Sequence, residues 1–116
     1  MTEEITSFEQ MDLTPEVARA IQKMGFSTPT PVQAQTILPM MDGYDIIAKA
    51  PTGTGKTCAF GIPLLECLRM DGKDIQAVVI CPTRELCIQI TEELRQLAAY
   101  LPEVRIVSIY GGQPIQ

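Results

Sequence analysis

The feature that most constrains this chain is a short apolar run followed directly by a glycine-rich segment, a lysine and a threonine. Residues 45–49 read DIIAK, and the next eight residues, 50–57, read APTGTGKT. A short apolar run of this kind indicates a buried strand, and the apolar positions from Phe60 onward indicate a helix that begins at Lys56. A strand, a tight glycine loop and a helix start are together typical of a phosphate-binding loop.

The residues of this loop match what a triphosphate requires. Binding needs inward-facing backbone N–H groups, the positive end of a helix, a cation, and a hydroxyl that can ligate Mg²⁺. Gly53 and Gly55 allow the tight turn, although Ala50 replaces the first glycine of the general pattern. Lys56 supplies the cation and Thr57 the hydroxyl, so both are catalytic candidates. A glycine-rich turn without a ligand would not require them.

The rest of the chain alternates helical and strand patterns. Residues 12–25 predict a helix in which Thr14 is the cap, Pro15 lies in the first turn and Gly25 ends the helix. Pro39 is expected to bend or shorten the helix that follows, which Thr30 caps and Pro31 begins. Further helices are predicted from 56 and over 86–101, and short buried strands over 45–49, 75–81 and 104–109. This alternation predicts an α/β fold, with a parallel sheet flanked by helices.

Composition limits the chain to one modest domain. It has 116 residues, of which 46% are apolar, and its net charge of −5 argues against a general basic surface for nucleic acid. No apolar run approaches the roughly 18 residues of a membrane helix, and the amino terminus is acidic where a signal peptide is basic. The expected location is therefore cytoplasmic, without membrane attachment.

The four cysteines do not form a recognisable metal or redox motif. They are Cys58, Cys67, Cys81 and Cys87, and the chain has no histidine to complete a zinc site. Each lies in or beside an apolar segment, as free cysteine does in a reducing compartment. We expect these cysteines neither to form disulfides nor to bind metal.

Gln33 has two interpretations that the residues alone leave open. Its amide can both donate and accept a hydrogen bond, which matches the N6 and N7 edge of adenine and would make a nucleotide site selective for ATP. The segment Thr30-Pro31-Val32-Gln33 also fits a capping box, in which Gln33 reaches back to the N–H of Thr30. One side chain could serve both purposes if the two groups lie close together.

Taken in order, these motifs resemble the opening part of a DEAD-box ATP-dependent RNA helicase of the bacterial cold-shock type. The resemblance rests on Phe8, the segment GFSTPTPVQ at 25–33, the loop at 50–57, PTREL at 82–86 with Gln89, and the glycine pair at 111–112. It covers essentially the whole chain. It implies an incomplete N-terminal RecA-like ATP-binding domain over 1–116, with a Q motif at 8–33, a P-loop at 50–57, motif Ia at 82–86 and a Gly-Gly motif at 111–112.

The resemblance also assigns roles to single residues. Phe8 would stack on adenine, Thr28 would line the base pocket and Gln33 would read the base edge. The cofactors would be ATP and Mg²⁺, with Thr57 as the metal ligand. The phosphates would be wrapped by Ala50, Pro51, Thr52, Gly53, Thr54, Gly55, Lys56 and Thr57.

RNA would bind a second group of residues. In the family, PTREL and the Gly-Gly pair hold the RNA backbone, which points to Thr83, Arg84, Gly111 and Gly112 here. Donors at the start of a helix favour a phosphate. Without the resemblance, Thr83 would be interpreted as a simple helix cap, Arg84 as a solvated charge paired with an acid, and the glycines as a turn that ends a strand.

Hydrolysis needs a further carboxylate that holds Mg²⁺, and no acidic pair ends an apolar strand in this sequence. We therefore expect an N-terminal helicase fragment that binds ATP or ADP, binds RNA weakly and does not hydrolyse ATP. Exposed sheet edges would favour self-association. Two other classes remain open: a self-contained, non-hydrolysing ATP-binding or interaction module, and a small-molecule P-loop kinase.

Overall fold

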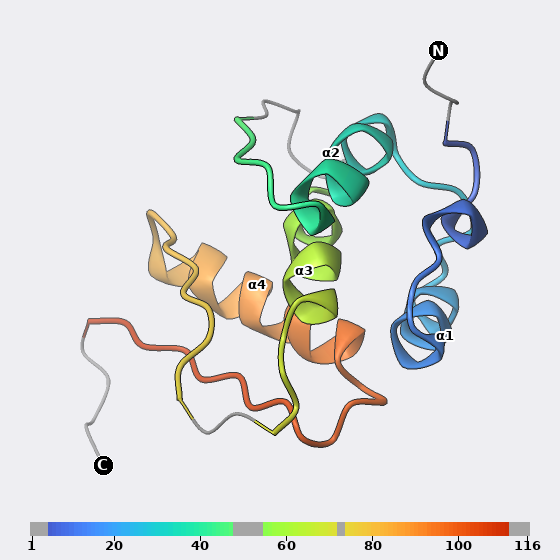
Figure 1. Ribbon diagram of the computed structural model, residues 1–116. Coiled ribbons are helices and arrows are strands. Elements are labelled where there is room, and N and C mark those ends of the chain that lie inside the picture. Colours follow the sequence, from blue (N-terminus) through green and yellow to red (C-terminus); the bar gives the residue numbers. More distant parts are fainter. Residues whose placement is uncertain (1–4, 48–54, 72–73, 112–116) are drawn as a thin grey trace.

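Four α-helices and one 3₁₀ helix make up the regular structure of the part of the chain described by the computed structural model, residues 5–47, 55–71 and 74–111. They are η1 (Phe8–Met11), α1 (Pro15–Lys23), α2 (Pro31–Met41), α3 (Lys56–Glu66) and α4 (Arg84–Leu97). Helix α3 lies between α2 and α4 and contacts both, while α1 packs against α3 and α4 (Figure 1). None of the described helices is long and apolar enough to cross a membrane.

The helix starts follow the capping residues of the sequence. Helix α1 begins at Pro15 after Thr14, as predicted, and Gly25 then adopts a left-handed φ of 90° just beyond its end. The Thr14 N–H and hydroxyl both donate to the Glu66 carboxylate at 3.0 Å, which ties the start of α1 to the end of α3. The hydroxyl of Thr14 therefore bonds to α3 and does not cap its own helix.

Two details of the helices differ from the expectation. Helix α2 continues through Pro39 to Met41, because a proline near the end of a helix removes only one backbone hydrogen bond. Helix α4 begins at Arg84 and ends at Leu97, where the sequence predicted 86–101. The apolar periodicity of this helix also predicted Leu86 on its buried face, but Leu86 is 37% exposed.

The core is formed by the faces that the four helices turn toward one another. Ile62 of α3 and Leu97 of α4 are fully buried at its centre. Burying an aliphatic side chain of this size stabilises a fold by about 1.5–3 kcal/mol. The other buried members are Phe8, Met11, Val17, Ile21, Ile37, Cys58, Leu65 and Leu94.

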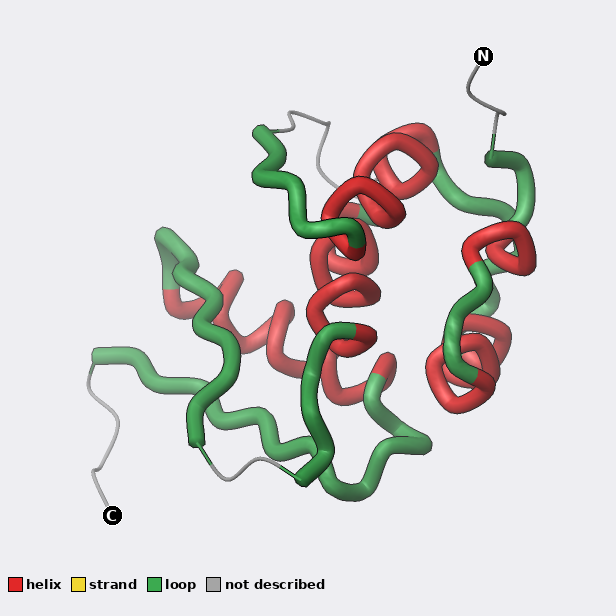
Figure 2. Tube along the Cα trace, in the orientation of Figure 1, coloured by secondary structure: helices red, strands yellow, loops and turns green. Residues whose placement is uncertain are grey.

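The predicted parallel sheet is not present among the described residues. Residues 75–81 and 104–109 form no strand, and neither do 45–47 of the first predicted strand (Figure 2), of which 48 and 49 lie outside the described residues. A strand requires a second extended backbone alongside it at about 4.8 Å in hydrogen-bonding register. Among the described residues, no backbone hydrogen bond outside the helices joins these segments to one another. The three segments are apolar, as a buried strand would be, but their described residues do not pair with one another into a sheet.

Gly61 allows α3 and α4 to approach closely. A Cβ at this position would lie 2.8 Å from Cδ2 of Leu94 and 3.0 Å from Cδ1 of Leu97, closer than carbon atoms pack. Glycine is otherwise unfavourable inside a helix by about 1 kcal/mol relative to alanine. Its presence here is therefore explained by the contact between the two helices.

We expect Gly61→Val to lower the free energy of unfolding by about 1–3 kcal/mol, because the added methyl groups force the two leucines out of their packed positions. Valine has a higher helix propensity than glycine, so a loss would report the contact and not the helix itself. Urea unfolding followed by circular dichroism measures this, with Gly61→Ala as the smaller step. Unchanged or increased stability in both variants would contradict this packing.

Candidate functional site: a phosphate-loop helix and an arginine pocket

Of the predicted phosphate loop, the structure describes residues 55–57, which form the start of α3. Gly55 is the N-cap residue, with a left-handed φ of 83°, and Lys56 and Thr57 form the first turn. Lys56 is exposed and Thr57 is half-buried. The first N–H groups of a helix have no partner within it, and they carry the positive end of the helix dipole. The predicted residues 50–54 lie outside the described residues.

Gln33 joins this helix start to α2. Its Oε1 accepts from the Thr30 N–H at 2.9 Å, and Thr30 Oγ1 accepts from the Gln33 N–H at 3.4 Å, which confirms the predicted capping box. Its Nε2 donates to the Gly55 carbonyl at 3.1 Å. The side chain is fully buried. Gln33 therefore holds the carbonyl of the residue at which α3 begins, a contact that the sequence spacing did not reveal.

Only glycine fits at position 55. A Cβ there would overlap Nε2 of Gln33, and it would lie 3.3 Å from Cγ2 of Thr30. The positive φ independently disfavours any other residue. The second glycine of the loop is thus required both by its own backbone and by the closeness of Gln33.

The other predicted adenine contacts lie on the N-terminal side of the molecule. Phe8 begins η1, and its side chain is only 8% exposed because it packs in the hydrophobic core. Thr28 is exposed on the loop between α1 and α2. Their contacts with a base stay predictions.

A second cluster brings together two motifs that are 27 residues apart. Arg84 Nη2 donates to the Gly111 carbonyl at 2.7 Å, and the Arg84 guanidinium carbon lies 5.4 Å from the centre of the Tyr110 ring. Thr83 is the N-cap of α4, and its hydroxyl accepts from the Leu86 N–H at 3.1 Å. Gly112 lies outside the described residues. Thr83, Arg84 and Gly111, the described residues of the predicted RNA site, therefore lie together at the start of α4.

These residues line a pocket of about 450 Å³ at the start of α4. Thr83 and Arg84 are exposed there, so the guanidinium and the first N–H groups of α4 can be reached from solvent. Positive charge and free helix N–H groups together favour an anion such as a phosphate. The pocket wall is completed by Val79, Ile80, Cys81, Pro82, Cys87, Ile109, Tyr110 and Gly111.

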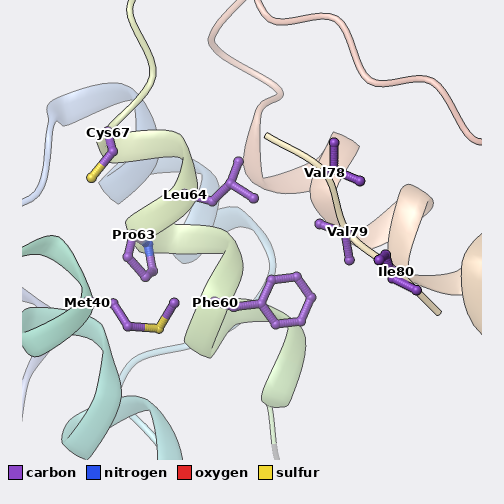
Figure 3. A pocket seen from close by; sticks show the side chains of 8 residues that line it. All are labelled: Met40, Phe60, Pro63, Leu64, Cys67, Val78, Val79 and Ile80. Atoms are coloured by element: carbon purple, nitrogen blue, oxygen red, sulfur yellow. The ribbon is translucent and has the colours of Figure 1, made fainter. Parts of the chain in front are cut away.

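A third surface is apolar and has no evident chemistry. It is an open groove of about 510 Å³ between α3 and residues 78–80. Figure 3 shows Met40, Phe60 and Leu64 on one side of it and the 78–80 segment on the other. Its remaining lining residues are Pro63 and Cys67.

Comparison with known proteins identifies the family of this chain. The family model of the DEAD/DEAH box helicases matches residues 30–116. The chain belongs to the DEAD/DEAH box helicase family. The resemblance inferred from Phe8, Gln33 and the motifs that follow is thereby confirmed.

Bacterial relatives within the family match nearly the whole chain. It is 47% identical over 112 residues to the DEAD-box ATP-dependent RNA helicase CshA of Geobacillus kaustophilus, covering 97% of this chain and 24% of that protein. The CshA protein of Bacillus subtilis is 47% identical over 109 residues, which is 94% of this chain and 22% of that protein. The chain thus spans about a quarter of the length of these curated relatives.

Solved structures of the family share the backbone arrangement. A DEAD box protein from the hyperthermophile Methanococcus jannaschii superposes with a TM-score of 0.82 at 35% identity, covering 97% of this chain and 31% of that one. The RNA-helicase Prp28 from Chaetomium thermophilum, bound to ADP, gives a TM-score of 0.85 at 32% identity, covering 98% and 29%. The chain therefore follows the path of DEAD-box proteins even where its described residues form no strands.

We expect Gln33→Ala to lower the free energy of unfolding by about 2 kcal/mol or more, because it leaves the Thr30 N–H without its acceptor and the Gly55 carbonyl without its donor. Gln35→Ala is the matched control, since Gln35 is exposed on the same helix and should change stability by less than about 0.5 kcal/mol. Urea unfolding measures both variants. Equal losses in the two would show that the Gln33 bridge contributes nothing.

Proposed function

We propose that this chain is the ATP-binding N-terminal part of an ATP-dependent RNA helicase that unwinds or remodels RNA. The observation that carries the proposal is the start of α3, where Gly55, Lys56 and Thr57 follow one another and Gln33 holds the N-cap carbonyl. Membership of the DEAD/DEAH box helicase family supports the same function. The proposed domain spans 1–116, with the Q motif at 8–33 and the P-loop at 50–57.

In this proposal the triphosphate lies at the N-terminus of α3. Lys56 is exposed at that end, so its ammonium can reach the β- and γ-phosphates. The Thr57 hydroxyl would take one ligand position on the Mg²⁺ that accompanies ATP. Residues Ala50 to Thr54 would complete the ring of N–H groups around the phosphates.

Adenine recognition is assigned to Gln33, with Phe8 and Thr28 as base contacts. A glutamine amide has two N–H donors and two acceptor lone pairs, and the protein uses one donor and one lone pair of Gln33. The remaining donor and lone pair match the N7 and N6 groups of adenine. Capping α2 and reading adenine are therefore compatible in one side chain, which must become accessible from its buried position when nucleotide binds.

RNA binding is assigned to the arginine pocket. Arg84 and the first turn of α4 would hold a backbone phosphate, with Thr83 and the N–H groups of Gly111 and Gly112 beside it. The hydrogen bond from Arg84 to the Gly111 carbonyl supports this, because it holds the two motifs at one site. We expect weak affinity, since the net charge of −5 opposes a polyanion.

We also propose that the 116-residue chain binds ATP without hydrolysing it. Phosphoryl transfer to water needs a carboxylate on Mg²⁺ and a group that orients the water, both usually separate from the phosphate loop. The acidic pair at the end of an apolar strand that would meet this need is absent from the sequence.

Nucleotide binding is tested by calorimetry on the folded chain. We expect heat on titrating ATP or ADP with Mg²⁺ and at least about tenfold weaker binding of GTP, which corresponds to about 1.4 kcal/mol. Lys56→Ala should abolish binding, because the phosphates lose their cation. Gln33→Ala should reduce the preference for adenine, whereas Gln35→Ala should keep it. Equal affinity for GTP would refute the role of Gln33, and no heat with any nucleotide would refute the phosphate site.

We further propose that the chain self-associates through the segments that were predicted to be strands. Ile75 is 86% exposed, Ile80 is 91% exposed and Val107 is 79% exposed. Apolar segments without a strand partner favour pairing with another chain. The apolar groove beside residues 78–80 adds to the surface that pairing could bury.

Analytical ultracentrifugation tests self-association. We expect wild-type chain to form dimers or larger species as its concentration rises, and Ile75→Lys combined with Val107→Lys to shift it toward monomer. The control is Gln22→Lys combined with Gln96→Lys, which adds the same charge at exposed polar positions. A wild-type monomer at all concentrations, or equal dissociation in both double variants, would contradict the proposal.

A further inference from the structure

The arginine pocket has an apolar side that a phosphate contact does not use. Ile80 and Ile109 line the pocket and are 91% and 84% exposed, and Tyr110 forms another part of the same wall. Sites for small organic molecules are usually hollows of about 300–1,000 Å³ with mostly apolar walls and a few polar groups. The pocket, at about 450 Å³, falls within that range. A phosphate alone needs a cation but no apolar wall, so the pocket fits a ligand that has an apolar part as well.

The ring of Tyr110 lies beside the guanidinium of Arg84. The guanidinium carbon is 5.4 Å from the ring centre, which is within the range of a cation–π contact. Arg84 also donates to the Gly111 carbonyl at 2.7 Å, so the residue that follows the ring is held at the same place. Two contacts of one arginine therefore hold an aromatic ring next to a cation.

Arg84 keeps donors for a phosphate while it makes these contacts. A guanidinium has five N–H donors. In the described part of the chain the Gly111 carbonyl takes one of them, so others remain for a phosphate. A single ribose separates the base of a nucleotide from its phosphate. A phosphate on Arg84 therefore brings a base close to the pocket wall that Tyr110 forms.

We propose that the arginine pocket binds one unpaired nucleotide of RNA, with its phosphate on Arg84 and its base against Tyr110 and the apolar wall. This inference rests on the proposed RNA function and adds a base contact to it. Unpaired bases are commonly held by stacking on aromatic side chains, and every base has a flat face that can do so. In a duplex the bases stack on one another, so the pocket selects single-stranded RNA.

A second tyrosine of the chain has the same kind of contact without the pocket. The centre of the Tyr100 ring lies 4.4 Å from the guanidinium carbon of Arg19 and 5.7 Å from the ammonium nitrogen of Lys23. Tyr100 does not line the arginine pocket. A cation over a ring is therefore not enough to define the site, and Tyr100 is a matched control for Tyr110.

Two RNAs that differ only in their bases test the base contact. A short fluorescent uridine oligomer and an oligomer of the same length whose riboses carry no base are titrated with the full chain. We expect the uridine oligomer to bind at least about fivefold more tightly, as one stacked base contributes. Because both RNAs carry the same charge, this ratio should persist between about 50 and 200 mM salt while both affinities fall.

The two titrations also separate the base contact from the proposed RNA function. Equal affinity for the two RNAs would overturn the base contact and leave the phosphate contact of Arg84 in place. Absence of binding by both RNAs would overturn the proposed RNA function together with the base contact.

Variants of Tyr110 locate the contact in the pocket. We expect Tyr110→Ala to lower the preference for the uridine oligomer to less than about twofold, whereas Tyr110→Phe, which keeps the ring, should retain it. Tyr100→Ala should retain it as well. Tyr110 is not part of the hydrophobic core, so its variants should stay folded, which far-ultraviolet circular dichroism checks. A preference that survives in Tyr110→Ala would overturn the assignment to this pocket.

Photocrosslinking tests the same contact without a variant. RNA that carries 5-bromouridine is bound to the wild-type chain and irradiated, and the tryptic peptides are analysed by mass spectrometry. Cleavage after Arg105 places Tyr110 on peptide 106–116 as its only aromatic residue. We expect a crosslink at Tyr110. Crosslinks on other peptides alone, as would occur if a second copy of the chain filled the pocket, would overturn the proposal.

Discussion

The structure depends on one buried amide. Gln33 accepts from the Thr30 N–H and donates to the Gly55 carbonyl, so it closes the first turn of α2 and fixes the N-cap of α3. Each bond alone contributes only about 1 kcal/mol, but leaving either half-buried partner without a hydrogen bond costs more. The start of α3 is the only described part of the predicted phosphate loop, and Gln33 sets its position. The side chain of Gln33 therefore joins the fold of α2 and α3 to the loop residues that are typical of the family.

The helices were predictable because their start signals are local. Thr14 with Pro15 and Thr30 with Pro31 marked two helix starts, and Lys56 marked a third, all at the observed residues. A cap acts through residues within one turn of the helix, so the residues next to the cap are enough to predict where the helix begins. The start of α4 was placed two residues late, at Leu86, because apolar periodicity located it; the alternative interpretation of Thr83 as a helix cap gives the observed start at Arg84.

Predictions that depended on distant neighbours were less successful. Residues 75–81 and 104–109 have the apolar sequence of buried strands. A strand, however, also needs a partner backbone, and in the described residues no backbone hydrogen bond joins these segments. The Arg84–Gly111 bond joins two motifs that sequence reasoning had only named together by resemblance.

The central claim is that Gln33 lies between the adenine and phosphate ends of one nucleotide site. Nuclear magnetic resonance on ¹⁵N-labelled chain tests it most directly, by following the side-chain amide of Gln33 and the backbone amides of Gly55, Lys56 and Thr57. Without ligand the Gln33 amide protons should exchange slowly with water, and all four sets of signals should shift together on adding ATP with Mg²⁺. Rapid exchange of that amide, or nucleotide shifts confined to other residues, would contradict the claim.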